Sequence, residues 1–292
     1  MVRLGRVRPA VEADGAVGAG VDPARAPTVP IRPLRFRELL DEPFALIQAH
    51  IRALAALGAC VLVLAVAVVL AVTGVVSHLT DGSDAGTAWA VVLATAVCLW
   101  LLRWVLRGAT VAMALADFGG VTFGAGAALR RAAKHAGPLL LAQVMFSLTG
   151  IGVLVVGSLL IVTYPLALIW LAQVRARRFV TEPVIIGEHA EFGAAVARSK
   201  HLVDGANWTI GGLWLTQRLI FTVLAVPLFG IPFYLSDFSG THRWAVITLL
   251  VSGLLLVVTV SEIVEATSRA ICYIDRRCAR EGMDIRLPGD SR

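Results

Sequence analysis

Three ionisable residues fall inside long apolar runs of this sequence. Arg218 lies in the run that begins at Asn207, and Glu262 and Glu265 lie in the run that follows Trp244. A charged side chain at the centre of a bilayer costs about 2.5–3.5 kcal/mol on insertion scales, so such residues usually pair or carry a function. At a helical rise of 1.5 Å per residue, Arg218 and Glu262 lie at similar depth. The sequence therefore predicts an intramembrane ion pair between Arg218 and Glu262, with Glu265 nearby.

Two interpretations of this pair stay open at the level of sequence. The pair could simply lock two helices together. Alternatively, it could open to receive an anionic head group or to relay a proton, because an intramembrane charge is a functional hypothesis by default.

A second set of basic residues lies in the cytoplasmic halves of the predicted second and fourth spans, with Glu182 nearby in sequence. Long arginine side chains in such positions commonly extend their charged ends to the membrane interface, which is our first interpretation. The alternative is a basic pocket between helices that contacts the phosphate of an anionic lipid. The set consists of Arg103, Arg107, Arg175, Arg177 and Arg178.

No pattern typical of catalysis accompanies these charges. The sequence lacks the GxxxxGK[ST], HExxH and GxSxG motifs, and its six His residues are scattered. The four Cys residues form no CxxC pair, so we expect neither a zinc site nor a disulfide framework. We therefore predict no metal and no cofactor, and an enzymatic role has little support.

The composition indicates whether water or lipid surrounds these residues. The chain has 292 residues, of which 58% are hydrophobic and 16% charged, and its mean hydropathy is +0.79. A soluble domain has roughly 45–50% apolar and about 25% charged residues, so an ordinary soluble enzyme and a disordered protein are both excluded. The net charge of +6 could suggest nucleic acid, but the charges flank apolar runs and form no basic helix. The expected surroundings are a lipid bilayer with anionic phospholipids, not nucleic acid.

Charge-free runs predict six transmembrane helices. The run 136–174 would be ~58 Å long as one helix, nearly twice the hydrocarbon thickness, so it must fold back. Thr163-Tyr164-Pro165 is the preferred turn because Pro suits the first turn of a helix, and 149–152 is the second choice. Pro227, Gly230 and Pro232 are expected to interrupt the fifth span. The predicted spans are 53–80, 85–116, 136 to the turn, 165–186, 207–234 and 244–273.

Basic residues set the predicted orientation. All but two of the 26 Lys and Arg residues, Arg218 and Arg243, fall at or beyond one face of the predicted spans. The positive-inside rule assigns that face to the cytoplasm and places both termini there, in the inner (plasma) membrane. We expect a disordered basic cytoplasmic tail over 1–33, a membrane domain over 34–275 and a short basic cytoplasmic tail over 276–292.

A weak internal repeat organises the spans. Polar–apolar segments of the length of a surface-lying helix precede each pair of spans and align on Phe36, Phe123 and Phe192. A unit of one interfacial helix and two spans, used three times, returns the chain to the same side each time. The predicted fold is therefore an all-α, polytopic membrane protein of six transmembrane helices in three pseudo-repeated units. The segments are 34–54, 121–140 and 190–208.

Four blocks resemble the glycerophosphoryl diester phosphodiesterase membrane-domain family. LRFRELLDEPFAL is similar to that family's xxGEILDxAFxL motif, and LLIVTYPLALIWLAQVR resembles its IVPGIYLAVR turn and helix. EPVIIGEHAEFGAAVARSKHLVDGANW and YIDRRCAREGMDIRL resemble its PxVVLEGxGxxxALRRSxxLVxGxxW and YxDLRxRREGxDL segments. The blocks lie in order between residues 34 and 287. Departures include Arg37 in place of Gly and Ala197-Arg198 in place of an Arg pair.

The resemblance is to stand-alone multi-pass members that lack the phosphodiesterase barrel, so it implies no hydrolysis by this chain. Our leading functional expectation is a non-enzymatic scaffold or accessory factor in envelope and membrane-lipid homeostasis, with a possible membrane-protein partner. The alternative is a small transporter or lipid flippase that uses the Arg–Glu pair, and an intramembrane lipid-modifying enzyme ranks last. A polar cavity that reaches both Arg218 and the Pro227–Pro232 segment would favour transport, whereas an apolar centre would favour the scaffold.

Overall fold

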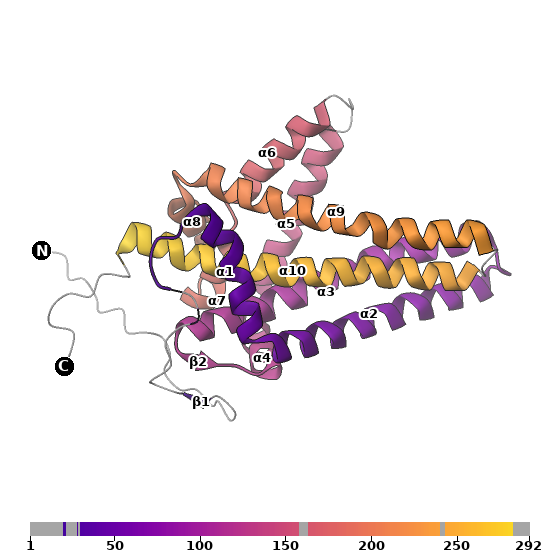
Figure 1. Cartoon of the computed structure of the whole chain (residues 1–292), viewed down its shortest axis with the longest axis horizontal. Helices are drawn as coiled ribbons and strands as arrows, with labels where there is room; N and C mark the ends of the chain where they lie inside the picture. The colour runs from indigo at the N-terminus through magenta and orange to yellow at the C-terminus, as the bar shows by residue number, and fades with distance from the viewer. Residues whose placement is uncertain (1–19, 22–27, 29, 158–162, 240–242, 283–292) are drawn as a thin grey trace, which may run out of the picture.

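The chain folds into an all-α bundle (Figure 1). The computed structural model describes residues 20–21, 28, 30–157, 163–239 and 243–282. Five helices in this part of the chain are long and apolar enough to cross a membrane. Four of them run side by side, and the fifth, α5, diverges from the bundle together with α6 (Tyr164–Ala176). The five are α2 (Ile51–Leu79), α3 (Asp84–Phe118), α5 (Ala136–Gly157), α9 (Asn207–Ser239) and α10 (Arg243–Glu281). The predicted all-α, multi-pass membrane fold is confirmed.

The long helices present apolar side chains outward. The most apolar stretch of α2 has a mean hydropathy of 3.0, and Val63, Leu64 and Leu79 are 64–75% exposed on it. A helix that is apolar all round needs an apolar solvent. A helix pairs most of its backbone N–H and C=O groups within itself, which is what lipid requires of a spanning segment.

Short helices gather at one end of the bundle (Figure 1). They are α1 (Phe36–Ala49), α4 (Ala125–Lys134), α7 (Thr181–Glu188) and α8 (Phe192–Val203). We call this the short-helix end, and we call the opposite end, where α2 turns into α3, the far end. Helices α1, α4 and α8 each precede two further helices, α2–α3, α5–α6 and α9–α10, which matches the order of the predicted repeat.

The predicted fourth span, 165–186, is wrong as a single helix. Helix α6 begins at Tyr164, with Pro165 in its first turn as expected, but it ends at Ala176 after 13 residues. That length covers only ~20 Å, which is less than the ~30 Å hydrocarbon core. The remainder forms α7, whose residues 181–186 are all buried within the protein. An apolar run cannot reveal whether lipid or a protein core surrounds it. The preferred turn itself borders residues 158–162, which lie outside the described residues.

Helix α9 corrects a second expectation. It continues through Pro227, Gly230 and Pro232 to Ser239, so these residues do not interrupt it. A proline removes one backbone hydrogen bond, but transmembrane helices tolerate this loss because neighbouring groups re-satisfy the freed carbonyl. Helix α10 likewise continues past the predicted domain boundary at 275 to Glu281.

The predicted tail over 1–33 lies mostly outside the described residues. Its described part touches the bundle. Strand β1 (Gly20–Val21) pairs antiparallel with the equally short strand β2 (Val121–Thr122). The Thr28 backbone N–H and hydroxyl donate to Asp117, whose carboxylate also lies 2.8 Å from Nε2 of His50.

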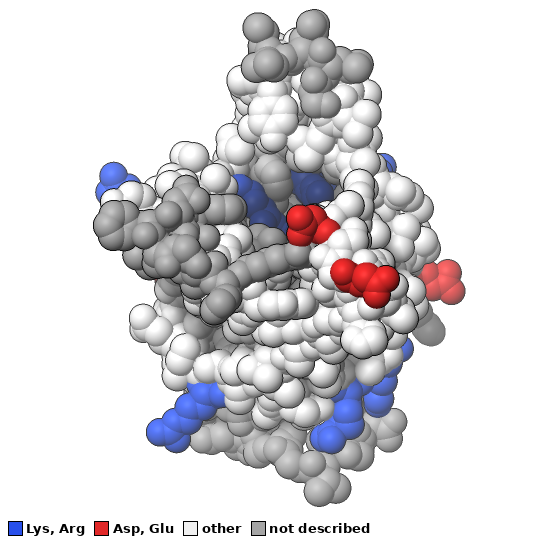
Figure 2. Space-filling view, turned by 90° about the vertical axis from the view of Figure 1, so that its right-hand side faces the viewer, with Lys and Arg blue, Asp and Glu red and all other residues white. Residues whose placement is uncertain are grey.

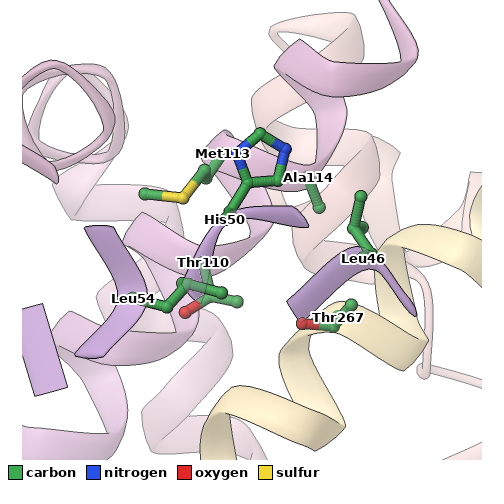
Figure 3. A pocket seen from close by; sticks show the side chains of 7 residues that line it. All are labelled: Leu46, His50, Leu54, Thr110, Met113, Ala114 and Thr267. Atoms are coloured by element: carbon green, nitrogen blue, oxygen red, sulfur yellow. The ribbon is translucent and has the colours of Figure 1, made fainter. Parts of the chain in front are cut away.

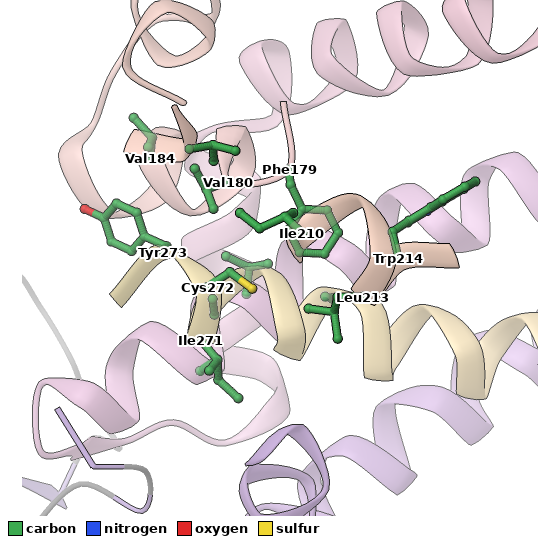
Figure 4. Packing of buried hydrophobic residues seen from close by; sticks show 14 of the residues in the cluster. Phe179, Val180, Val184, Ile210, Leu213, Trp214, Ile271, Cys272 and Tyr273 are labelled. Atoms are coloured by element: carbon green, nitrogen blue, oxygen red, sulfur yellow. The ribbon is translucent and has the colours of Figure 1, made fainter. Parts of the chain in front are cut away.

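Two apolar cores divide the bundle along its length. The larger one lies at the short-helix end and includes Phe179, Val184, Ile210 and Ile271, which come from α7, α9, α10 and the segment before α7 (Figure 4). The smaller one lies between α2, α3 and α10 toward the far end. It comprises Leu57, Ala65, Val69, Cys98, Leu102, Leu106, Ala109, Val251 and Leu255.

Candidate functional site: a buried ion cluster

Five arginines and three glutamates meet between the two cores, and we call them the ion cluster. They come from α3, α6, α7, α9 and α10, so the cluster joins segments that are distant in sequence. The members are Arg103, Arg107, Arg175, Arg218, Arg269, Glu182, Glu262 and Glu265.

Glu262 is fully buried and faces α3. Its carboxylate accepts from Nε of Arg103 at 2.8 Å and from Nε of Arg107 at 2.5 Å. The predicted Arg218–Glu262 pair therefore does not form, and Arg218 instead donates to Glu265. Similar depth along two helices does not decide which side chains meet. Residues three positions apart on a helix share a face but lie about 60° apart around its axis, and Glu265 is the one that meets Arg218 on α9.

Glu265 and Glu182 share a second, deeper arginine. Arg269 is completely buried and donates from Nη2 to Glu265 at 2.6 Å and from Nη1 to Glu182 at 2.6 Å. Its Nη1 also lies 3.3 Å from the Phe179 carbonyl oxygen. Sequence reasoning missed Arg269 because it was counted with the basic residues beyond the sixth span. The signal was present: Glu265 and Arg269 are four positions apart, the spacing of a helical ion pair.

Arg107 is buried rather than extended to the interface, which corrects the first interpretation of this residue. Besides Glu262, its Nη1 donates to the Gln143 side-chain oxygen at 3.0 Å and to Glu182 at 3.4 Å. Its Nη2 lies 3.8 Å from Glu265 and has no hydrogen-bond partner among the described residues. Carboxylates from α7 and α10 replace the water that a lone buried arginine would need.

Aromatic rings line the cluster. The guanidinium carbons of Arg175 and Arg269 each lie 5.1 Å from the centre of the Phe146 ring on α5, and that of Arg107 lies 5.9 Å from it. The Trp214 ring lies 5.7 Å from Arg218 and 5.9 Å from Arg175. Contacts of a cation with a ring face are attractive, and most so where water is excluded.

Arg175 differs from the other arginines of the cluster. Within the described part of the chain, no carboxylate lies within 4 Å of its guanidinium. Its Nη2 donates to the Phe146 carbonyl oxygen at 3.3 Å, and its buried Nε has no partner there. Gly150 makes room for it, since a Cβ at that position would lie 2.7 Å from Nη2 of Arg175.

Arg177 and Arg178 lie outside the ion cluster. Arg177 is exposed, and Arg178 donates to the Thr149 hydroxyl at 3.4 Å. Of the five predicted lipid-contact residues, the structure thus brings Arg103, Arg107 and Arg175 together and leaves these two at the edge.

The depth of the cluster matches one face of a bilayer. Arg103 lies about 19 positions from the far-end start of α3, and Glu262 lies about 19 positions from the far-end start of α10. Both distances correspond to ~29 Å, close to the ~30 Å thickness of the hydrocarbon. With the far end at one interface, the cluster lies at the level of the lipid head groups on the short-helix side.

The cluster is open on one side. Figure 2, which views the bundle from the far end, shows basic side chains recessed beneath the α5–α6 hairpin. Arg103 and Arg218 are 28% and 29% exposed, whereas Arg107 and Arg269 are buried. The cluster therefore has a buried half, in which charges pair, and an accessible half.

A small cavity lies apart from the ion cluster, between α1, α2, α3 and α10 (Figure 3). Leu46, Leu54, Met113 and Ala114 supply most of its wall, with His50, Thr110 and Thr267 as polar lining. The buried Thr110 hydroxyl has no partner among the described residues. The space suits about one water molecule, not an organic substrate.

In the part of the chain that the structure describes, the ion cluster is built from ion pairs, hydrogen bonds and contacts of guanidinium groups with rings. No group of three or more His, Cys, Asp or Glu residues in the described part of the chain could hold a metal ion. Every glutamate of the cluster is engaged by at least two arginines. Comparison with protein-family models, with curated proteins and with solved structures finds no match to this chain.

Proposed function

We propose that this chain is a non-enzymatic accessory or scaffold protein of the plasma membrane that acts in membrane-lipid homeostasis by engaging anionic phospholipid at its short-helix end. Both termini are cytoplasmic in this proposal, since the Lys and Arg residues concentrate at that end. Membership of the glycerophosphoryl diester phosphodiesterase membrane-domain family is part of the same proposal, and the sequence blocks are its support.

One observation carries the proposal: five arginines face three glutamates at the depth of a lipid head-group layer. The excess of two positive charges is costly at a membrane boundary unless an anion approaches it. The cytoplasmic leaflet supplies anionic lipids, and basic pockets between helices bind their head groups. The protein therefore serves as a fixed, positively charged contact for that leaflet.

The apolar core toward the far end weighs against the transporter alternative. Val69, Leu102, Leu106 and Leu255 are each at most 1% exposed and fill the centre of the α2, α3 and α10 contact. A polar path from the cluster to the far end would need polar groups at these positions. Their apolar character favours a static module over a solute pathway.

The proposal is tested by lipid analysis of cells that lack the protein. We expect the ratio of anionic to zwitterionic phospholipid to change on its removal and to return when the wild-type chain is supplied. An unchanged ratio would contradict the homeostasis role. A reporter fused after Arg292 tests the orientation, and activity on the outer side of the membrane would contradict it.

A reconstitution experiment separates the proposal from transport. Purified chain is placed in vesicles that contain a head-group-labelled phospholipid, and the label exposed to an external quencher is followed over time. We expect the same slow rate as in protein-free vesicles. An acceleration that is abolished by Arg218→Met would support a flippase and overturn the scaffold proposal.

A further inference from the structure

We infer that the accessible half of the ion cluster is a binding site for the phosphate of an anionic glycerophospholipid, which enters sideways from the leaflet beneath the α5–α6 hairpin. Arg103, Arg175 and Arg218 are the ligands. The inference deepens the proposed function and rests on it only for the biological role of the bound lipid.

The first argument is the distribution of charge within the cluster. Arg107 and Arg269 make close contacts with all three glutamates, so the carboxylates are mostly satisfied from the buried side. The remaining arginines come from α3, α6 and α9, and the guanidinium groups of Arg175 and Arg218 lie 5.9 Å and 5.7 Å from the same Trp214 ring. Such a convergence of like charges is unfavourable unless an anion lies between them.

The second argument is the supply of free donors. Among the described residues, Arg103 uses only Nε and Arg218 uses only one Nη nitrogen in hydrogen bonds to carboxylates. The buried Nε of Arg175 has no partner, and its Nη2 bonds only to a carbonyl oxygen. A guanidinium has five N–H donors, and phosphate oxygens match its planar fork. The site therefore offers several charge-assisted hydrogen bonds.

The third argument distinguishes a lipid from a free phosphate ion. The three helices that carry the ligands also expose apolar side chains: Leu101 on α3, Ile169 on α6 and Leu219 on α9 are 43–64% exposed. Acyl chains can lie along these helices while the phosphate occupies the recess. A free phosphate ion would make no favourable contact with these apolar side chains. It would also have to enter a recess that borders on lipid.

Arg175 provides the sharpest test of the site. Because no carboxylate in the described part of the chain pairs with it, Arg175→Ala leaves no glutamate uncompensated and should not unfold the protein. Arg177→Ala is the matched control, since it removes an exposed arginine from the same segment. Arg218→Gln adds a second test, because Glu265 keeps Arg269 as a partner.

The experiment is native mass spectrometry of the purified full chain titrated with phosphatidylglycerol in detergent. We expect one retained lipid on the wild type and on Arg177→Ala. We expect roughly tenfold weaker retention on Arg175→Ala, which corresponds to the loss of one hydrogen bond to a charged group. Phosphatidylcholine should bind more weakly than phosphatidylglycerol to the wild type, since its choline cancels the charge.

Three outcomes would overturn the inference. Equal retention on the wild type and Arg175→Ala would remove the site, and equal loss on Arg177→Ala would reduce it to general surface charge. Displacement of the lipid by an equimolar amount of inorganic phosphate would identify a soluble-anion site instead. Failure of the proposed function would give another result. Lipid retention would still depend on Arg175, but the lipid composition of cells would not change when the protein was removed.

Discussion

The two halves of the bundle are held together by different interactions. Toward the far end, apolar side chains point both inward and outward, and the core between α2, α3 and α10 consists of residues such as Val69 and Leu255. At the short-helix end, α7 and the start of α9 are enclosed in a dense core, and eight charged residues meet at its boundary. The halves thus resemble, respectively, a membrane bundle and the interior of a soluble domain.

The difference follows from the solvent that each half displaces. In lipid, burying a leucine gains little hydrophobic free energy, because the acyl chains are as apolar as the protein core. At the short-helix end, burial removes apolar surface from water and gains about 25 cal/mol per Å². The ion cluster lies at the boundary between these two halves. At that boundary, paired charges cost less free energy than they would at the centre of the lipid.

The largest expected effect comes from breaking the buried half of the ion cluster. Arg269→Met removes the arginine that bridges Glu182 and Glu265. Removing one partner of a buried pair costs about 3–5 kcal/mol, because the remaining charge is left in a poor solvent. Heating in detergent followed by size-exclusion chromatography should show a lower unfolding temperature than that of the wild type.

Two further variants give this result its meaning. Arg177→Met, at an exposed arginine, should retain the wild-type unfolding temperature. Adding Glu182→Gln to Arg269→Met should recover part of the loss, because the unpaired carboxylate is removed. No loss in the single variant would mean that the cluster does not stabilise this half.

The same substitution placed in each half tests the comparison directly. Leu202 on α8 and Leu255 on α10 are both fully buried. Leu202→Ala should cost about 2–5 kcal/mol, the usual sum of transfer and cavity contributions. Leu255→Ala should cost about 1–2 kcal/mol, since lipid cancels most of the transfer contribution and leaves the cavity. Equal losses in the thermal assay would show that both halves displace the same solvent.

The sequence predicted the bounds of some helices well, but it predicted poorly which side chains face one another. Charge-free runs placed α2 and the start of α9 within two residues, because hydrocarbon tolerates no charges along the exposed face of a span. The helix towards which a side chain points depends on how the helices pack, and a single apolar segment of sequence does not contain that information. Glu262 was therefore assigned to the wrong arginine. Arg269 was missed for a related reason. An arginine near the end of a span is counted as a charge that sets membrane orientation, unless the glutamate four positions before it is considered as an ion-pair partner.

The hairpin of α5 and α6 offers a smaller test, on how the second pair of helices packs. A Cβ at Gly157 would overlap the Cβ of Ala167, whereas Gly152 has open space around it. Gly157→Ala should therefore destabilise by about 1–3 kcal/mol through overpacking. Gly152→Ala should be neutral or slightly stabilising, because alanine is the better helix former. Matching unfolding temperatures for the two variants would contradict this close contact.

The smallest effect is expected from pH, and it should arise at the short-helix end alone. Nε2 of His135 lies 3.3 Å from Nδ1 of His189, and Arg131 and Lys134 are near it. Burial first, and then these positive neighbours, lower the pKa of His135 below its ordinary value of 6.5. Between the folded and unfolded pKa values the unfolded chain binds more protons, so stability falls as the pH drops below about 6.5 and stops falling below the folded pKa.

The variants His135→Gln and His78→Gln locate this pH dependence in one half. His78 is exposed near the far end, so its replacement should leave the fall in unfolding temperature between pH 7.5 and 5.5 as in the wild type. His135→Gln should reduce that fall, because glutamine does not titrate. The histidine pair joins the start of α5 to the end of α7. A smaller fall in unfolding temperature would therefore also show that this contact is present in the folded protein. An unchanged slope in His135→Gln would assign the acid sensitivity to other groups.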